Sequence, residues 1–258
     1  MRIQAIPVFK DAHILRKTML EALSDHAYLS HRLVYQGYGD GILSGCELTT
    51  TQDSVILNEG TVFYKGEMFL IKEPAEVSYF PTNTTTVLKL YISEPKEDHS
   101  LLYREMDLKL TEGDIAGEGI ELCRFKLQEG ARLRFQYQDF FDRQTEFDTL
   151  NIIHAPYAVK GGSALSPEIT RAFAKEMLSI KDLPTEDVQF CLQLLGRERP
   201  AEKEMLAAYI RWREGKALEE WSNEALYKGL AGILKKAGNK EGLEDDSPGR
   251  KKWKMIVE

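Results

Sequence analysis

Cysteine is scarce in this 258-residue chain and occurs only at Cys46, Cys123 and Cys191. The three residues are far apart and none belongs to a Cys-x-x-Cys pair, so we expect neither a disulfide framework nor a zinc ribbon. The first seven residues contain no apolar stretch typical of a secretory signal. The sequence therefore predicts a cytoplasmic protein whose cysteines are reduced and buried.

Positive charge is also in short supply. The chain has 34 Lys and Arg residues against 41 Asp and Glu residues, which gives a formal net charge of −7. Because nucleic-acid binding depends on clustered basic residues, we expect no nucleic-acid partner. No apolar run approaches the roughly 18 residues that a membrane-spanning helix needs, so we expect no membrane span either.

The motifs that most often mark enzymes are missing. The sequence has no G-x-x-x-x-G-K-[ST] phosphate loop, no H-E-x-x-H zinc motif and no G-x-S-x-G nucleophile turn. Its five histidines are dispersed, which favours surface or locally hydrogen-bonded roles. We therefore predict a protein that is not an enzyme and has no catalytic residue, no cofactor and no metal site.

Two charged stretches have a functional and an ordinary interpretation. One loop has carboxylates that suit a divalent cation, but it lacks EF-hand spacing and is typical of a solvated connection; its acids are Glu112, Asp114, Glu118 and Glu121. Residues 250–254 read RKKWK, which suits an anionic surface. That stretch follows three acids closely, so a mixed-charge tail is favoured.

The order of patterns along the chain predicts an α+β protein, in which an antiparallel β-sandwich or small barrel is followed by a compact C-terminal helical segment. The expected parts are an N-terminal segment with a short amphipathic helix at 1–36, an antiparallel β domain at 37–141, a connector at 142–165, a helical bundle domain at 166–238 and a mobile charged tail at 239–258. In the first part, Asp11 is a candidate cap and Ser24-Asp25 a candidate end of the helix.

Short apolar runs separated by turn residues fill the predicted β domain. Thr85–Ser93 is the clearest strand, with apolar residues on both faces. Lys65-Gly66 has the length of a two-residue hairpin loop, and residues 128–131 are predicted to join a second hairpin. Four glycines are predicted to form structural turns, and at the first three a β-branched replacement is expected to be harmful: Gly45, Gly60, Gly66 and Gly130.

The last third of the chain has helical spacing. Residues 166–168 read Ser-Pro-Glu, a start signal that combines a cap, a first-turn proline and an acid near the positive end of the helix dipole. Three further helices are predicted to open at 184–186, at 200–202 and at about 217, the last ending near Ala237 before Gly238. Trp212 and Trp221 lie on apolar faces of these helices, which favours core packing over a binding role.

A more specific pattern lies inside the β domain. Residues 41–48 read GILSGCEL and residues 57–68 read LNEGTVFYKGEM, and the runs 87–93 and 119–127 follow in order. Together they resemble the small β domain of phage tail and baseplate proteins, over about residues 37–140. The resemblance implies a structural subunit of a phage tail or of a phage-derived contractile device. A helical segment replaces the expected fibrous C-terminus, which favours an adaptor over a receptor-binding part.

The sequence thus suggests a non-enzymatic structural or adaptor component, assembled with other tail or baseplate subunits into a phage-like particle and itself a homo-oligomer. The alternative is a carbohydrate- or protein-binding β-sandwich module with a helical partner domain, which predicts an exposed aromatic platform from Tyr35, Tyr38, Tyr64 or Tyr79. A third hypothesis, an unrecognised enzyme or nucleic-acid processing factor, predicts a deep pocket around His99 or His154 and the loop acids.

Overall fold

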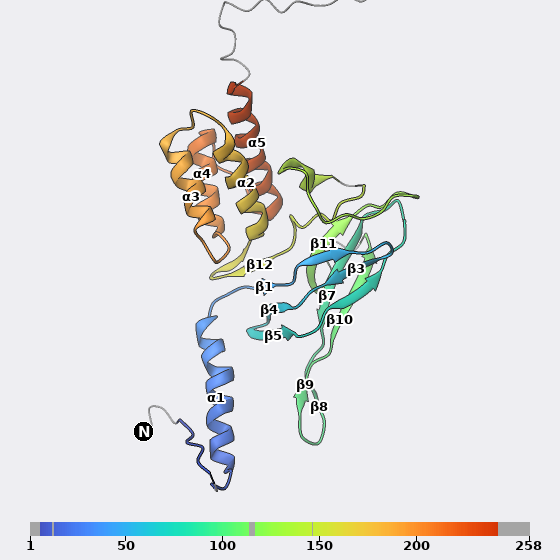
Figure 1. Ribbon diagram of the computed structural model, residues 1–258, viewed down its shortest axis with the longest axis vertical. Helices are drawn as coiled ribbons and strands as arrows, with labels where there is room; N and C mark the ends of the chain where they lie inside the picture. Colours follow the sequence, from blue (N-terminus) through green and yellow to red (C-terminus); the bar gives the residue numbers. More distant parts are fainter. Residues whose placement is uncertain (1–5, 12, 114–116, 146, 242–258) are drawn as a thin grey trace, which may run out of the picture.

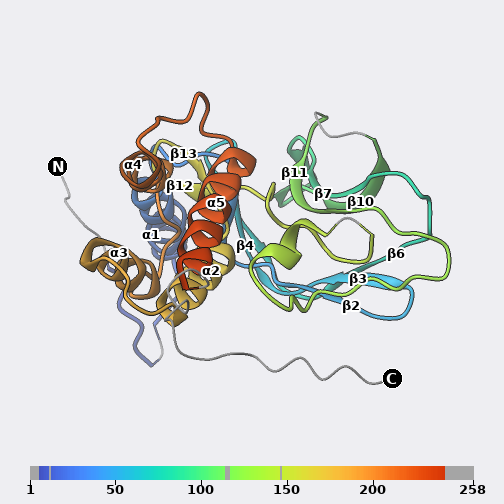
Figure 2. The ribbon, with the colours of Figure 1, turned by 90° about the horizontal axis from the view of Figure 1, so that it is seen from above.

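The computed structural model describes residues 6–11, 13–113, 117–145 and 147–241. Figure 1 shows three parts in succession: an N-terminal helix that projects from the body, a group of small sheets, and a C-terminal bundle of helices. The predicted α+β fold with a C-terminal helical segment is confirmed. The sheets are arranged like a sandwich, and none closes into a barrel within the described ranges (Figure 2).

Within the described residues, one α-helix precedes the strands in the sequence and four α-helices follow them. Their bounds are α1 Lys17–Val34, the 3₁₀-helix η1 Phe141–Gln144, α2 Pro167–Ser179, α3 Thr185–Leu195, α4 Lys203–Glu214 and α5 Asn223–Glu241. None of these helices is both long and apolar enough to cross a membrane, as far as the chain is described.

The strands form small sheets with the orders β13-β12-β1-β4-β5, β10-β7-β11 and β2-β3-β6, and β8 pairs with β9. Their bounds are β1 Gly41–Gly45, β2 Leu48–Thr50, β3 Ser54–Leu57, β4 Gly60–Tyr64, β5 Glu67–Ile71, β6 Ala75–Ser78, β7 Thr86–Ile92, β8 Lys96–Glu97, β9 Leu102–Tyr103, β10 Met106–Glu112, β11 Ile120–Phe125, β12 Tyr157–Val159 and β13 Gly162–Ala164.

The core of the β region gathers around the central strand β7. The first five residues of this strand are all buried, and it pairs antiparallel with both β10 and β11. The strand predicted at Thr85–Ser93 is therefore confirmed. Buried side chains from several sheets meet here and hold the sheets together; they include Ile42, Val55, Leu57, Val62, Leu88, Leu122 and Leu150.

The hairpin predicted at Lys65-Gly66 joins β4 to β5. The two strands pair antiparallel up to Tyr64 and Glu67, so the loop has two residues. Lys65 has φ +49° and Gly66 has φ +83°. Two successive positive φ angles are the geometry of a type I′ turn, which matches the twist of the flanking strands. This prediction is confirmed.

The second predicted hairpin is wrong. Residues 132–137 do not return beside β11; instead, Arg134 forms a parallel bridge with Thr149. The guanidinium of Arg134 bonds both carboxylate oxygens of Asp142, at 2.5 and 2.6 Å, and lies 3.3 Å from Asp148. These charge-assisted contacts hold the segment against residues that follow it in the chain, and they replace the local turn.

The helical core is formed by α2, α3, α4 and α5. The hydroxyl of Ser166 accepts the N–H of Glu168 at 3.2 Å, and Pro167 opens α2, so the predicted start signal is confirmed. Gly215 ends α4 with φ +67°. The buried side chains of this second core include Phe140, Ile169, Phe173, Met177, Leu206, Ile210, Leu226, Tyr227 and Leu230.

The last helix is shifted relative to the prediction. Residues 217–222 are not helical, because the hydroxyl of Ser222 accepts a backbone N–H of the first turn and so sets the start of α5. The helix also continues through Gly238, which was expected to follow its end. Trp221 precedes α5 and is 46% exposed, and Trp212 on α4 is 52% exposed. The prediction that both tryptophans pack in the core is therefore wrong.

The predicted connector at 142–165 contains structure that ties the two cores together. β12 pairs parallel with β1, through Ile42 and Tyr157, and antiparallel with β13. The side-chain amide of Asn223, at the start of α5, donates to the carbonyls of Ala155 and Ala164 at 3.2 and 3.3 Å. The bundle is thus anchored on the last strands of the five-stranded sheet, while the division into domains stays a prediction.

Helix α1 is longer than predicted and has none of its residues buried. It begins after Arg16, which makes no side-chain cap, and it continues through Ser24-Asp25 to Val34. The proposals that Asp11 caps it and that Ser24-Asp25 ends it are therefore wrong. Figure 1 shows α1 extending away from the sheets, below the strands β4 and β5.

Candidate functional site

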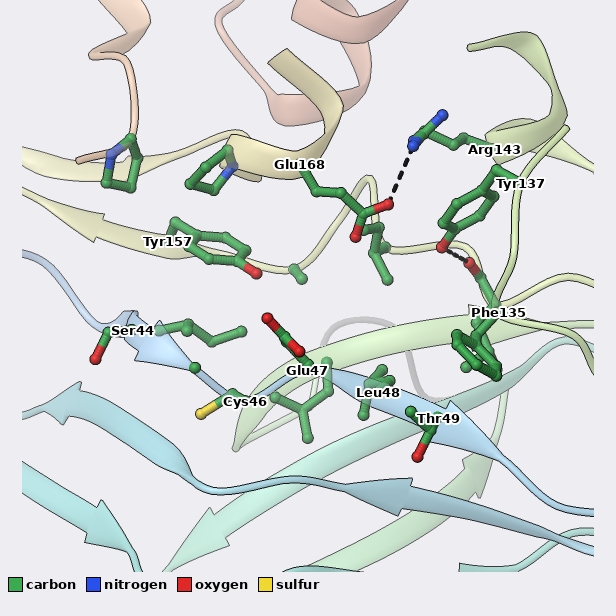
Figure 3. Close-up of a pocket in the computed structure, with 18 of the residues that line it drawn as sticks. Ser44, Cys46, Glu47, Leu48, Thr49, Phe135, Tyr137, Arg143, Tyr157 and Glu168 are labelled. Carbon is green, nitrogen blue, oxygen red and sulfur yellow. Dashed lines mark hydrogen bonds and ion pairs between the residues drawn. The ribbon is translucent and has the colours of Figure 1, made fainter. Parts of the chain in front are cut away.

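A cleft of about 690 Å³ lies where the β region meets the helical bundle. Residues 42–49 of β1 and β2 form one wall, and the start of α2 with residues 198–200 forms the other. Figure 3 shows Phe135 and Tyr137 at one end of this cleft and Tyr157 on the wall opposite Glu47. Its volume falls within the range of about 300–1,000 Å³ that is typical of ligand sites.

The lining of the cleft combines apolar and polar surface in similar amounts. Leu48 and Ile152 pack against the β core from the floor of the cleft, and the ring of Phe135 is 36% exposed. The remaining apolar residues come from both walls: Ile42, Leu43, Leu122, Leu150, Ala155, Pro167 and Pro200. A ligand that enters this cleft would therefore cover apolar surface on both of its sides.

One cation is fixed at the edge of this lining. Arg143 is 7% exposed; its Nη1 donates to the carbonyl of Asp139 and its Nη2 to Glu168, both at 3.0 Å. Its guanidinium lies 4.3 Å from the centre of the Tyr137 ring. The charge of Arg143 is therefore balanced by Glu168, and the pair joins η1 to the first turn of α2.

Carboxylates outnumber cations in the cleft. Glu47 and Glu198 line it together with Glu168, against the single guanidinium of Arg143. Within the described part of the chain, neither Glu47 nor Glu198 has an ion-pair partner. Figure 3 shows the carboxylates of Glu47 and Glu168 pointing into the cleft from opposite walls. The cleft therefore favours a ligand with positive charge.

The hydroxyls and the thiol of the cleft are held in their neutral forms. The hydroxyl of Tyr137 donates to the carbonyl of Leu150 at 2.6 Å, and burial raises its pKa. Burial also raises the pKa of Tyr157 and the pKa of the Cys46 thiol, each to about 12. Because the thiolate is the reactive form, Cys46 is an inert buried thiol at neutral pH. These groups suit binding better than nucleophilic chemistry.

Strand β2 borders the cleft, and the hydroxyl of its last residue, Thr50, donates to the carbonyl of Leu133 at 3.0 Å. β2 is an edge strand of its sheet, and its Leu48 and Thr49 line the cleft. The carbonyl of Glu47 accepts the N–H of Asn58, and the N–H of Thr51 donates to Ser54. Because antiparallel ladders alternate, the backbone N–H and C=O of residues 48 and 50 point away from β3. No backbone partner meets them there within the described residues.

The cation and histidine sites considered from the sequence do not assemble. Glu121 is paired with Arg124, and Asp114 lies outside the described residues. No group of three or more His, Cys, Asp or Glu residues within the described ranges is placed to hold a metal ion. His99 is exposed between β8 and β9, whereas His154 is half-buried before β12, where burial lowers its pKa.

The four tyrosines of the predicted aromatic platform also separate. Tyr35 and Tyr38 meet edge to face, with ring centres 5.2 Å apart, and both lie near Phe63. Tyr79 is 5% exposed and packs in the β core, so it belongs to no exposed platform. The ring of Tyr64 lies beneath the ammonium of the neighbouring lysine instead.

The predicted turn glycines differ in their surroundings. Gly45, Gly66 and Gly130 have positive φ angles. Gly60 does not, but a Cβ there would lie 2.3 Å from the backbone nitrogen of Cys46. Their tolerance to substitution stays a prediction. The three cysteines are free and buried, as expected.

The sequence alone did not reveal the cleft. Its walls come from several segments that lie far apart in the chain, and its key ion pair joins Arg143 to Glu168. Glu168 was noticed only as an acid that suits the start of a helix, and no local signal pointed to Arg143. The acids and the apolar residues of the cleft come together only when the two cores pack against each other.

Fold and cleft together describe an α+β chain with two cores and a cleft at their junction. Neither a family model nor a curated protein matches the sequence. Among solved structures, the chain is similar to one described as the crystal structure of TssK, with 12% identity, a TM-score of 0.41 and coverage of 90% of this chain and 69% of that chain. A second similarity is to a chain of the baseplate complex from the type VI secretion system, with 11% identity, a TM-score of 0.24 and coverage of 98% and 94%.

Proposed function

We propose that the protein is a non-enzymatic structural adaptor, held among other subunits of a phage-tail baseplate or of a related contractile device. The sequence pattern over residues 37–140 supports this class of assembly. The observation that carries the proposal is the bare apolar face of α1, because such a face requires a protein partner.

The apolar face runs along the whole of α1. Leu20, Leu23 and Leu33 are 50%, 45% and 67% exposed, although they recur at helical spacing. Lys17, Glu21, Asp25 and Arg32 lie on the opposite face. Most helical stability in proteins comes from packing of the apolar face rather than from intrinsic propensity. The face of α1 therefore has its stable environment in an assembly.

A second copy of the chain is the partner that we propose for this face. The same stripe on two or more copies is self-complementary, which is how symmetric oligomers are built. Full burial of one leucine side chain contributes about 1.5–3 kcal/mol, so several leucines per copy offset the cost of association. The sheets and the bundle would then be displayed around a central group of α1 helices.

The mass of the protein in solution tests this arrangement. Size-exclusion chromatography with light scattering should give an oligomer for the natural chain and a monomer for the double variant Leu20→Glu/Leu23→Glu. Tyr28→Glu is the matched control, because Tyr28 is 76% exposed and lies on the polar side of α1. If the double variant keeps the mass of the control, α1 does not hold the oligomer.

The assembly itself is tested by co-expression with the products of neighbouring genes. We expect tail or baseplate subunits to be encoded nearby and to co-purify with the natural chain. Co-purification should be lost or weakened when α1 carries the two glutamates. Turnover of a substrate by the purified protein would contradict the non-enzymatic role.

A further inference from the structure

The cleft between the two cores has carboxylates on both of its walls, and two of them are unpaired. Glu47 lies on the wall formed by β1 and β2, and Glu198 lies on the wall formed by the bundle. Both residues are exposed, and neither has an ion-pair partner in the part of the chain that the structure describes. Glu168 is balanced by Arg143, which is the only cationic residue of the described lining. With three carboxylates against one guanidinium, the lining has an excess of two negative charges.

The cleft already holds one guanidinium of its own against an aromatic ring and a carboxylate. The guanidinium of Arg143 lies 4.3 Å from the centre of the Tyr137 ring and donates to Glu168 at 3.0 Å. Such an arrangement combines a cation–π contact with a charge-assisted hydrogen bond. Two further rings, those of Phe135 and Tyr157, lie at the end and on the wall of the same cleft (Figure 3). Together with the unpaired carboxylates, these rings offer the same combination to a ligand.

We propose that the cleft binds an arginine-containing segment of a partner subunit, with two arginines among apolar residues. The proposal rests on the proposed function, in which other subunits surround the chain. Two arginines balance the two excess charges of the lining. A guanidinium suits the cleft better than an ammonium, because it is planar, has five N–H donors in a fixed fork and stacks on aromatic rings. It can therefore bond a carboxylate on one wall while its face covers a ring on the other.

The apolar part of the lining favours a protein segment over a small organic cation. Leu43 and Leu48 line one wall, and Pro167 and Pro200 line the other. Apolar side chains beside the arginines would cover this surface, whereas a polyamine would leave much of it in water. The chain's own basic stretch, residues 250–254, lies outside the described residues, and the segment proposed here belongs to a separate chain.

A labelled peptide of sequence Leu-Arg-Leu-Arg-Leu tests the chemistry of the ligand. Its binding to the full-length protein is measured by fluorescence anisotropy. Two matched peptides replace both arginines, one with lysine and one with citrulline, which keeps the shape of arginine without its charge. We expect the arginine peptide to bind about tenfold more tightly than the citrulline peptide and about threefold more tightly than the lysine peptide. Binding of the arginine peptide no tighter than either of the others overturns the proposal.

The double variant Glu47→Gln/Glu198→Gln tests the place at which the peptide binds. Both side chains are exposed and hold no ion pair within the described ranges, so we expect the melting temperature to stay the same. The arginine peptide should bind about tenfold more weakly, because the two unpaired charges are lost. Glu73→Gln/Glu129→Gln is the matched control, since it removes the same charge from exposed positions outside the cleft. Equal weakening by the control would mean attraction to the overall charge and would overturn the site.

Phe135→Leu tests the aromatic contact. It removes the ring and keeps an apolar side chain at an exposed position. Because only the charged peptide gains a cation–π contact, we expect the arginine peptide to bind about threefold more weakly and the citrulline peptide to bind as before. Equal weakening of both peptides would mean that Phe135 contributes only apolar area, and it would overturn the ring contact.

Light scattering separates this proposal from the oligomer proposed for α1. The natural chain and both double glutamine variants should have the same mass, because α1 is unchanged in all of them. A lower mass for Glu47→Gln/Glu198→Gln alone would mean that the cleft holds a second copy, and it would overturn the separate partner. A monomeric natural chain that still binds the arginine peptide would contradict the role of α1 and would support the cleft as an independent site.

Discussion

Helices α1 and α2 carry apolar residues at the same spacing and differ in what covers them. On α2, Phe173 is fully buried among aromatic rings from three other parts of the chain. On α1, Leu20 occupies an equivalent place on the apolar stripe and is half exposed. The spacing of apolar residues along a helix thus indicates which face is to be buried. Whether residues of the same chain bury that face is determined only by the fold.

The largest expected difference in stability is between truncation of a buried residue on α2 and truncation of an exposed residue on α1. Phe173→Ala should lower the free energy of unfolding by about 3–5 kcal/mol, because it removes a fully buried ring and leaves a cavity. Leu20→Ala should cost less than about 0.5 kcal/mol in dilute protein, where α1 is bare. Urea denaturation followed by circular dichroism measures both. Similar losses in dilute protein would mean that α1 is packed after all.

A second test compares a buried charge contact in the bundle with an exposed one on α1. Asp187 on α3 is fully buried, accepts the hydroxyl of Tyr209 at 2.9 Å and lies 3.3 Å from Arg213. Burial raises the pKa of Tyr209, so this hydroxyl stays a donor. Asp187→Ala should cost about 3 kcal/mol, because it leaves buried polar groups without their partner.

The exposed counterpart is the pair of Lys17 and Glu21, one turn apart on α1 at 3.3 Å. Glu21→Ala should cost about 0.3 kcal/mol, since water screens an exposed pair. Raised salt should reduce this small effect further and leave the loss from Asp187→Ala nearly unchanged. The comparison fails if the exposed pair proves as costly to remove as the buried one.

The same contrast explains which elements could be predicted from the sequence. The start of α2 is set by a local signal, the Ser166 hydroxyl, so it is found where the sequence places it. The segment 132–137 has the pattern of a strand, but its path is fixed by the contacts of Arg134 with Asp142 and Asp148. No local pattern encodes such a choice of partner.

The cleft was beyond prediction for the same reason. Two of its carboxylates, Glu47 and Glu198, are 151 positions apart in the chain and line one cleft because β12 and α5 anchor the bundle on the sheet. Of the histidines that the sequence suggested, His99 is exposed between β8 and β9, whereas His154 lies near charged side chains that include Glu121 and Glu224 and does not line the cleft. Residue type identifies chemistry that is possible, whereas the packing of two cores decides which groups share a site.

A third test extends the comparison to the turn between β4 and β5. There Gly66 has no close neighbours, but its backbone conformation restricts which residues can replace it. Gly66 has φ +83°, and a Cβ there would meet open space. Gly66→Val should nevertheless cost about 1–2 kcal/mol, because a branched residue is strained at positive φ. Gly66→Asn is the matched control, since asparagine tolerates this conformation. An unchanged melting temperature for the valine variant would contradict the turn.

A last test separates two glycines on α5, at which the same substitution is expected to have opposite effects. A Cβ at Gly229 would lie 2.8 Å from the Cδ1 of Ile210 on α4, whereas at Gly232 it would meet nothing within 4 Å. Gly232→Ala should raise the free energy of unfolding by about 0.5–1 kcal/mol, through the better helix propensity of alanine. Gly229→Ala gains the same propensity but must displace Ile210, so we expect a net loss of about 1 kcal/mol.

Thermal denaturation of the two alanine variants side by side measures this difference in sign. A rise in melting temperature for both would mean that α4 and α5 are less closely packed than their contact at Gly229 implies. On α1 no such split is expected, because none of its residues is buried and a substitution there acts through propensity alone in the monomer. Changes in melting temperature of opposite sign at the two positions of α5 would indicate a helix that packs within its own chain. Uniformly small changes on α1 would indicate a helix whose packing partner lies in another molecule.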